Sequence, residues 1–281
     1  MNFNLMKTLF LILIFFITQS CSFDNKSGIW NNENVISDKE IDSFNEFKKL
    51  SSVNKVFNEN IPVKKDFNFE LIQIFKNQDW SDIFYDSTNN LKNFSFNETN
   101  NVTFKSKKLT RNRINNYILY KDQKIVAWDE EGNIIIFSIK KNKILKKFNF
   151  YKKKFKKLKK KLNIILQDDT LYVSDNLGYL YALNYKNLNV LWAKNYKIPF
   201  RSNIKIIKNK LVAANQNNDL IFFDKKSGEK LNIIPTEETT VKNEFINSVS
   251  FYKEMLFFLN TYGSLYSINT DIMRINWFIN L

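Results

Sequence analysis

Few residues of this 281-residue chain are of the types that catalyse reactions. The sequence contains no histidine, the side chain that most often acts as a general base and as a metal ligand. It contains one cysteine, Cys21, so no intramolecular disulfide and no cysteine-rich metal site can form. The densest acidic group near a repeated motif is Asp129-Glu130-Glu131, which we interpret as a solvated turn. We therefore expect no enzymatic activity, no catalytic residues, no metal site and no cofactor.

The single cysteine follows a segment with the features of a signal peptide. The apolar run from Leu9 to Ile17 is too short to cross a bilayer comfortably and fits the central region of a secretory signal. The residues before Cys21 resemble a bacterial lipobox, in which the cysteine takes a diacylglycerol, although Thr18 stands where leucine is usual. The alternative is a secretory signal followed by a chance thiol. We expect a signal peptide at residues 1–20, lipidation of Cys21 and a lipid anchor in a membrane.

Charge alone does not identify a partner. The formal net charge is +15, which favours anionic surfaces without choosing among them. Residues 21–60 are polar and read as a lipidated tether. The Lys-rich run 152–161 is interpreted as a solvated edge, since lysines on outer strands block edge-to-edge pairing. A contact with a membrane surface is the alternative, and nucleic acid is not expected as a partner because exported proteins seldom meet it.

Four segments of the chain share one pattern of short apolar runs around a turn. Their centres are Gly132, Gly178, Asn218 and Gly263. The second and fourth segments each carry a tryptophan fourteen residues after the glycine, Trp192 and Trp277. A period of about 40–45 residues with strand-like patterning is typical of β-propeller blades. We predict an all-β protein whose repeats each form a four-stranded blade.

The repeat around Gly178 shows how one blade is built. Its predicted strands are Leu162–Leu166, Leu171–Ser174, Tyr179–Asn184 and Val190–Lys194. Glycine or asparagine at the centre supplies the positive φ of the turn between the second and third strands. A tryptophan on the fourth strand can bury a wide flat ring between neighbouring blades. We therefore assign a structural docking role, and no ligand, to Gly132, Gly178, Trp192, Gly263 and Trp277.

These repeats resemble a known family. The tryptophan-docking motif of PQQ-type repeats, A-x-D-x-x-T-G-x-x-x-W, is similar to the segment formed by Ala182, Asn184, Asn187, Leu188 and Trp192. With the lipobox and tether, residues 118–281 are similar to BamB-family lipoproteins, propellers of the outer-membrane β-barrel assembly machinery. That family has eight blades, whereas four repeats are clear here, with residues 61–117 as a divergent blade or linker. We predict an incomplete propeller of about four to five blades and favour a truncated chain; the alternative is a smaller ring that closes with the N-terminal strands.

The resemblance implies a function, a place and a contact surface. It implies a non-catalytic scaffold, lipid-anchored at the periplasmic face of the outer membrane, that binds a barrel-assembly subunit. By analogy with an inter-blade loop of the family, the residues expected to bind this partner are Val241, Lys242, Glu244 and Phe245. They lie in the long connection Ile234–Ser248, which is otherwise an ordinary loop before a strand at Phe245–Phe251. The alternative functions are an exported quinoprotein dehydrogenase and a surface lipoprotein that binds another ligand.

Overall fold

The computed structural model describes residues 22–23, 30–31, 73–75, 79–95, 101–102, 104–151, 155, 157–237 and 246–281. The chain divides into two compact units, Met1–Phe69 and Glu70–Leu281. In the first unit, β1 (Ser22–Phe23) pairs antiparallel with β2 (Trp30–Asn31). The predicted signal peptide and the lipidation site Cys21 lie outside the described residues. Among the described residues, no helix is long and apolar enough to span a bilayer.

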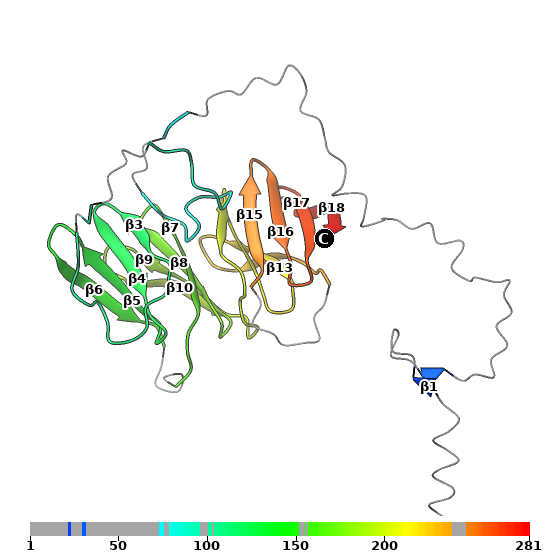
Figure 1. Cartoon of the computed structure of the whole chain (residues 1–281), viewed down its shortest axis with the longest axis horizontal. Helices are drawn as coiled ribbons and strands as arrows, with labels where there is room; N and C mark the ends of the chain where they lie inside the picture. Colours follow the sequence, from blue (N-terminus) through cyan, green and yellow to red (C-terminus); the bar gives the residue numbers. More distant parts are fainter. Residues whose placement is uncertain are drawn as a thin grey trace, which may run out of the picture. The chain divides into compact units, whose positions relative to one another are not determined.

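The second unit consists of four four-stranded antiparallel sheets, each an up-and-down meander (Figure 1). Blade 1 contains β3 (Leu119–Lys121), β4 (Lys124–Trp128), β5 (Asn133–Ser138) and β6 (Lys143–Asn149). Blade 2 contains β7 (Leu162–Gln167), β8 (Thr170–Asp175), β9 (Tyr179–Asn184) and β10 (Val190–Asn195). Blade 3 contains β11 (Lys205–Ile207), β12 (Lys210–Ala214), β13 (Leu220–Asp224) and β14 (Lys230–Ile234). Blade 4 contains β15 (Ser248–Tyr252), β16 (Met255–Leu259), β17 (Ser264–Asn269) and β18 (Arg274–Asn280). The predicted β-propeller of four-stranded blades is confirmed.

The same side-chain device closes the turn between the second and third strands of every blade. The residue three positions before each repeat centre is Asp129, Asp175, Asn215 or Asn260. In each case Oδ1 accepts hydrogen bonds from the backbone N–H groups two and four residues later. An Asx side chain that bonds its own backbone in this way fixes a tight turn. The repeat centre, at the fourth residue of the turn, then has φ between 66° and 88°.

Three hydrophobic clusters join neighbouring blades. Because side chains alternate across a strand, each central sheet has two apolar faces, and each face packs on a neighbour. Blades 1 and 2 share the cluster that contains Trp128 and Tyr181, and blades 2 and 3 share the one that contains Ala182 and Phe223. Blades 3 and 4 share the cluster around Phe222. The interior therefore consists of successive interfaces between sheets, as a propeller requires.

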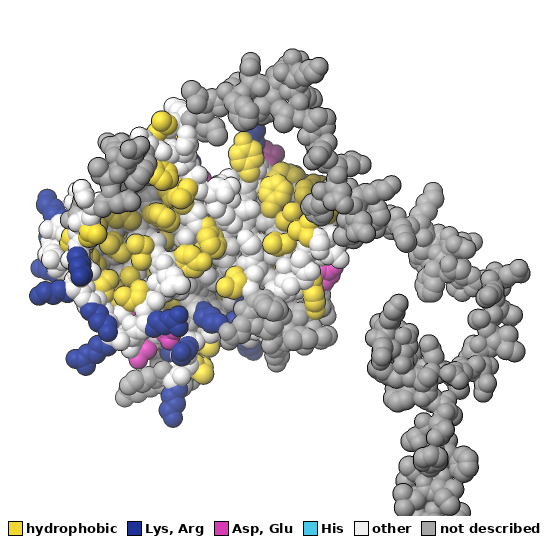
Figure 2. All heavy atoms as spheres, viewed as in Figure 1, with side chains coloured by type: hydrophobic (Ala, Val, Ile, Leu, Met, Phe, Trp, Pro, Cys, Tyr) yellow, Lys and Arg dark blue, Asp and Glu magenta, His cyan; other side chains and the backbone are white. Residues whose placement is uncertain are grey.

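The two outermost faces of this series of blades differ. Blade 1 buries Ile135 and Phe137 on its outer face, and Phe104 lies with its ring centroid 6.0 Å from that of Phe137. On blade 4 the corresponding outward face carries Phe257 and Trp277, and Trp277 is 44% exposed. Figure 2 shows hydrophobic side chains gathered over this blade. In the described residues, no hydrophobic cluster joins blade 4 to blade 1.

Two local expectations were wrong. The strand predicted at Phe245–Phe251 begins at Ser248, because Asn247 is held in a bridge with Ser202 of the preceding blade. The acidic turn of blade 1 is not solvated throughout, since Asp129 is 1% exposed. Its carboxylate is buried because six hydrogen bonds converge on it, two of them from Thr110 and Asn112 in the segment before β3.

Candidate functional site: the inner strap and the connection rim

One segment crosses the inner strands of all four blades. We call residues 79–90 the strap. Trp80 exchanges two backbone hydrogen bonds with Tyr120 of β3, of 2.7 and 2.8 Å. The carbonyl of Ser81 accepts from Leu166 N of β7, and the carbonyl of Ser87 accepts from Phe251 N of β15, both at 2.8 Å. The strap therefore forms β-bridges with two of the four inner strands, β3 and β7, and a single backbone hydrogen bond with a third, β15.

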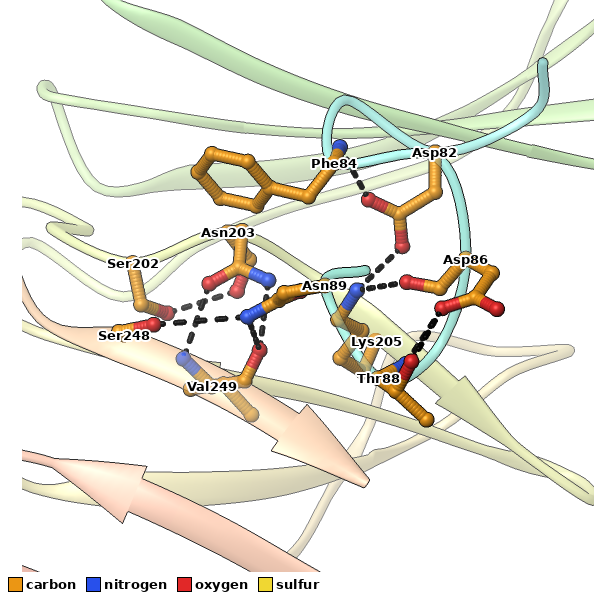
Figure 3. A network of polar contacts seen from close by, with 10 residues as sticks. All are labelled: Asp82, Phe84, Asp86, Thr88, Asn89, Ser202, Asn203, Lys205, Ser248 and Val249. Atoms are coloured by element: carbon orange, nitrogen blue, oxygen red, sulfur yellow. Dashed lines mark hydrogen bonds and ion pairs between the residues drawn. The ribbon is translucent and has the colours of Figure 1, made fainter. Parts of the chain in front are cut away.

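The fourth inner strand is held by a buried ion pair. Lys205, at the start of β11, places Nζ 2.6 Å from Asp82 Oδ2, and the two side chains are 0% and 5% exposed (Figure 3). The same Nζ donates to the carbonyl of Asp86 at 2.7 Å. Burial raises the pKa of Asp82, against the opposing pull of Lys205, and burial likewise lowers the pKa of Lys205. Because both charges are removed from water, the pair adds little net stability but would be costly to break.

A polar network fixes blades 3 and 4 beneath the end of the strap. The side-chain amide of Asn203 makes the pair of hydrogen bonds that a neighbouring strand's backbone would make with Val249. Its Nδ2 donates to the carbonyl of Val249, and its Oδ1 accepts from Val249 N. Asn89 of the strap donates to the same carbonyl at 3.1 Å, as Figure 3 shows. A cavity of about 230 Å³ lies between the strap and the inner strands, lined by both, including Asp82, Ile165 and Phe251.

A second candidate surface lies at one end of the sheets. In a meander, the turn between the second and third strands and the connection to the next sheet fall at the same end, which we call the connection rim. Hydrogen bonds join the two sets, for example from Lys160 N to the carbonyl of Glu130 and from Tyr196 N to that of Gly178. The described residues of the Lys-rich run 152–161 and the two described flanks of the long connection Ile234–Ser248 belong to this rim.

The described part of the Lys-rich run is only partly solvated. Lys160 is 4% exposed, donates from Nζ to the carbonyl of Phe155, and lies 5.3 Å from the ring centroid of Tyr151. Burial lowers its pKa. Gly132 makes this arrangement possible, because a Cβ on Gly132 would overlap the Tyr151 ring and lie close to the Lys160 side chain. The other described lysines of the run, Lys157, Lys159 and Lys161, are exposed.

Both flanks of the long connection are tied to the blades. Glu237 Oε2 accepts from Asn260 Nδ2 and Ser264 Oγ of blade 4, at 2.8 and 2.7 Å. At the other flank, Asn247 N donates to the carbonyl of Arg201, and Asn247 Nδ2 to that of Asn215. The four residues predicted to bind a partner, Val241, Lys242, Glu244 and Phe245, lie between these anchors and outside the described residues.

The predicted docking residues lie at two kinds of place. Gly132, Gly178 and Gly263 occupy turns at the connection rim, with φ of 82°, 84° and 88°. Trp192 packs its six-membered ring against Gly228 in the turn between β13 and β14 of the next blade, and a Cβ on that glycine would overlap the ring. Trp277 has the same register, opposite Ser267 as Trp192 is opposite Ala182. It contacts Phe257 of its own blade instead.

Sequence reasoning did not find the strap or Glu237. The strap has no regular pattern, and its contacts reach residues 123 and 160 positions away, as with Lys205 and Val249. The Asx turn had a visible signal, an Asp or Asn three positions before each repeat centre. Among the described residues, no group of three or more acidic, His or Cys side chains is placed to hold a metal ion.

Comparisons with known proteins give propellers at low similarity. No protein-family model and no curated protein sequence matches the chain. Among solved structures, BamB from Moraxella catarrhalis is similar at 13% identity and a TM-score of 0.45, over 58% of this chain and 47% of that chain. The computationally designed Ika4 protein is similar at 11% identity and a TM-score of 0.47, over 58% of this chain and 95% of that one. The β-propeller domain of Myceliophteria thermophila Cps50 (Swd1) is similar at 9% identity and a TM-score of 0.45, over 57% of this chain and 54% of that one. The matched part of this chain thus spans about half of the BamB chain.

Proposed function

We propose that the protein is a non-catalytic scaffold that binds a partner protein through the connection rim. In full, we propose a lipid-anchored, BamB-like lipoprotein at the periplasmic face of the outer membrane, whose partner is a subunit of the β-barrel assembly machinery. The propeller fold supports this proposal, since loops on a rigid scaffold commonly carry binding.

The double anchoring of the long connection is the observation that carries the proposal. Glu237 and Asn247 tie its two flanks to different blades, through four hydrogen bonds of 2.7–3.1 Å. The described residues on the two sides of 238–245 therefore have fixed positions on the rim. Anchoring of this kind lowers the entropy that a loop loses when it binds, because its ends are already placed.

A co-purification experiment tests the partner. Full-length protein with a C-terminal tag is isolated from detergent-solubilised membranes, beside a variant with alanine at Val241, Lys242, Glu244 and Phe245. A control variant carries Lys140→Ala and Lys141→Ala in the turn between β5 and β6, at the other end of the sheets. We expect a barrel-assembly subunit with wild type and control, and its loss from the loop variant. If wild type retains none, the assembly role is wrong; if the loop variant retains it, the loop is not the contact.

A fractionation experiment tests the anchor separately. We expect Cys21→Ser to move the protein from the membrane fraction to the soluble periplasmic fraction, because acyl chains supply the membrane affinity. Radiolabelled palmitate should be incorporated by wild type and not by this variant. Label in the variant, or an unlabelled wild type, contradicts lipidation at this residue.

A further inference from the structure

The strap lies across the blades in the manner of a bound peptide. Its backbone pairs with the inner strands at Tyr120, Leu166 and Phe251, and one carboxylate reaches Lys205. Addition of an extended peptide to a strand edge uses the same elements: main-chain hydrogen bonds give affinity and a few side-chain contacts give specificity. We propose that the inner strands form a peptide-binding groove, that the strap is its built-in occupant, and that an extended acidic peptide can replace it.

The strap fits its groove imperfectly, which makes replacement feasible. Tyr85 has a φ of 79°, a conformation that costs a bulky residue about 1 kcal/mol. Asn89 Oδ1 is buried without a hydrogen-bond partner. The cavity of about 230 Å³ between the strap and the inner strands is open to solvent, so the strap leaves part of this surface uncovered. An extended peptide that follows the inner strands would avoid the strained Tyr85 conformation and fill this space.

Lys205 decides which peptides fit. Its side chain is fully buried, and in the described structure its Nζ is bound by Asp82 and by the carbonyl of Asp86. A peptide that displaces the strap removes both partners and must bring an anionic group to the same place, since an unpaired buried cation is costly. The groove therefore selects a peptide that places one Asp or Glu carboxylate among backbone contacts. This inference does not depend on the assembly role, because it involves neither a membrane nor the long connection.

The test uses a labelled peptide with the sequence of residues 79–91 and the full-length protein, with binding read by fluorescence anisotropy. In Asp82→Ala the strap loses its carboxylate while Lys205 remains, so we expect the peptide to bind at least tenfold more tightly than to wild type. A peptide with alanine at the position of Asp82 should lose at least tenfold affinity for that variant. In the Asp82→Ala background, a further Lys205→Met change should remove the preference for the peptide that carries the aspartate, and Lys205→Arg should keep part of that preference.

Hydrogen exchange gives a readout that is independent of the label. In Asp82→Ala, the Leu166 and Phe251 amides should exchange faster than in wild type, and added peptide should slow them again. Near-UV circular dichroism identifies the variants that keep the native fold. If Lys205→Met does not fold, amide exchange at Leu166 and Phe251 is measured in the Lys205→Arg variant in its place. The proposal is overturned if folded Asp82→Ala gains no affinity, if the peptide without its aspartate binds equally well, or if the peptide leaves both amides unprotected.

Discussion

The contact between Trp192 and Gly228 allows a quantitative test of how neighbouring blades are held together. Trp192 is partly buried and packs against the next blade at a glycine whose φ is 72°. Truncation of a fully buried tryptophan to alanine costs about 3–5 kcal/mol, so partial burial predicts about 2–3 kcal/mol for Trp192→Ala. Trp277 provides the matched control, because it has the same register but is 44% exposed, and no glycine of the described residues packs against its ring. Trp277→Ala should cost about 1 kcal/mol or less.

Gly228→Ala separates two causes of instability. Left-handed backbone costs an alanine about 1 kcal/mol. The new methyl group would also overlap the indole, and such overpacking typically costs about 1–3 kcal/mol. In a Trp192→Ala background the overlap disappears and only the backbone cost remains. The double variant should therefore be more stable, by about 1–2 kcal/mol, than the sum of the single effects predicts.

Urea unfolding monitored by far-UV circular dichroism measures all four proteins of this cycle. Tryptophan fluorescence is avoided as the reporter because the substitution removes a fluorophore. Additivity within about 0.5 kcal/mol would show that the ring and the glycine do not act as one contact in solution. Equal losses for Trp192→Ala and Trp277→Ala would refute the assignment of the interface to the first tryptophan.

Three further substitutions probe the turns at the connection rim. Gly178→Ala should lower the free energy of unfolding by about 2–4 kcal/mol, and Gly263→Ala by about 1 kcal/mol. Both glycines have positive φ, but a Cβ at Gly178 meets the backbone of Lys197 at 2.9 Å, whereas the nearest atom to a Cβ at Gly263 is 3.7 Å away. Thermal unfolding compares the two variants, and equal shifts in Tm would contradict the clash. Asp129→Asn should keep its turn, as asparagine does in blades 3 and 4, but lose the acceptor for Thr110, at about 2–3 kcal/mol near neutral pH. Burial raises the pKa of Asp129, but the stronger combined effect of its hydrogen bonds lowers this pKa below the usual 3.8. The ionised carboxylate therefore stabilises the fold at pH values above 3.8, and this stabilisation is lost as the pH falls through the lowered pKa. The stability gap between wild type and variant in urea titrations should thus narrow below about pH 4, and a gap that widens there would contradict the assignment.

The repeated part of the fold could be predicted from sequence because its signals are local. Each blade is a meander, so its hydrogen bonds join residues near in the chain, and the glycine or asparagine at each centre marks the same turn. The predicted strand Tyr179–Asn184 has the bounds of β9, and Leu162–Leu166 ends one residue before β7 does. Periodicity and turn chemistry were enough for these elements.

The candidate site depends on contacts that no local pattern encodes. Asp82 and Lys205 are 123 residues apart, and neither stands in a motif that marks it as buried. Trp192 was recognisable as a docking residue, but its acceptor Gly228 belongs to a repeat that has no tryptophan of its own. Lysines are mostly solvated, so the burial of Lys160 and Lys205 could not be read from composition.

The strap also has a consequence for how the protein folds. Its backbone and side-chain contacts with β15 join Ser87 and Asn89 to residues about 160 positions later. Each blade can form from local contacts as it is synthesised, whereas this closure must wait until the last blade has left the ribosome. Contacts of such high sequence separation are slow to form because a long loop must close first. Refolding should therefore be biphasic, with the blades forming in the fast phase and protection of the Phe251 amide arising in the slow one.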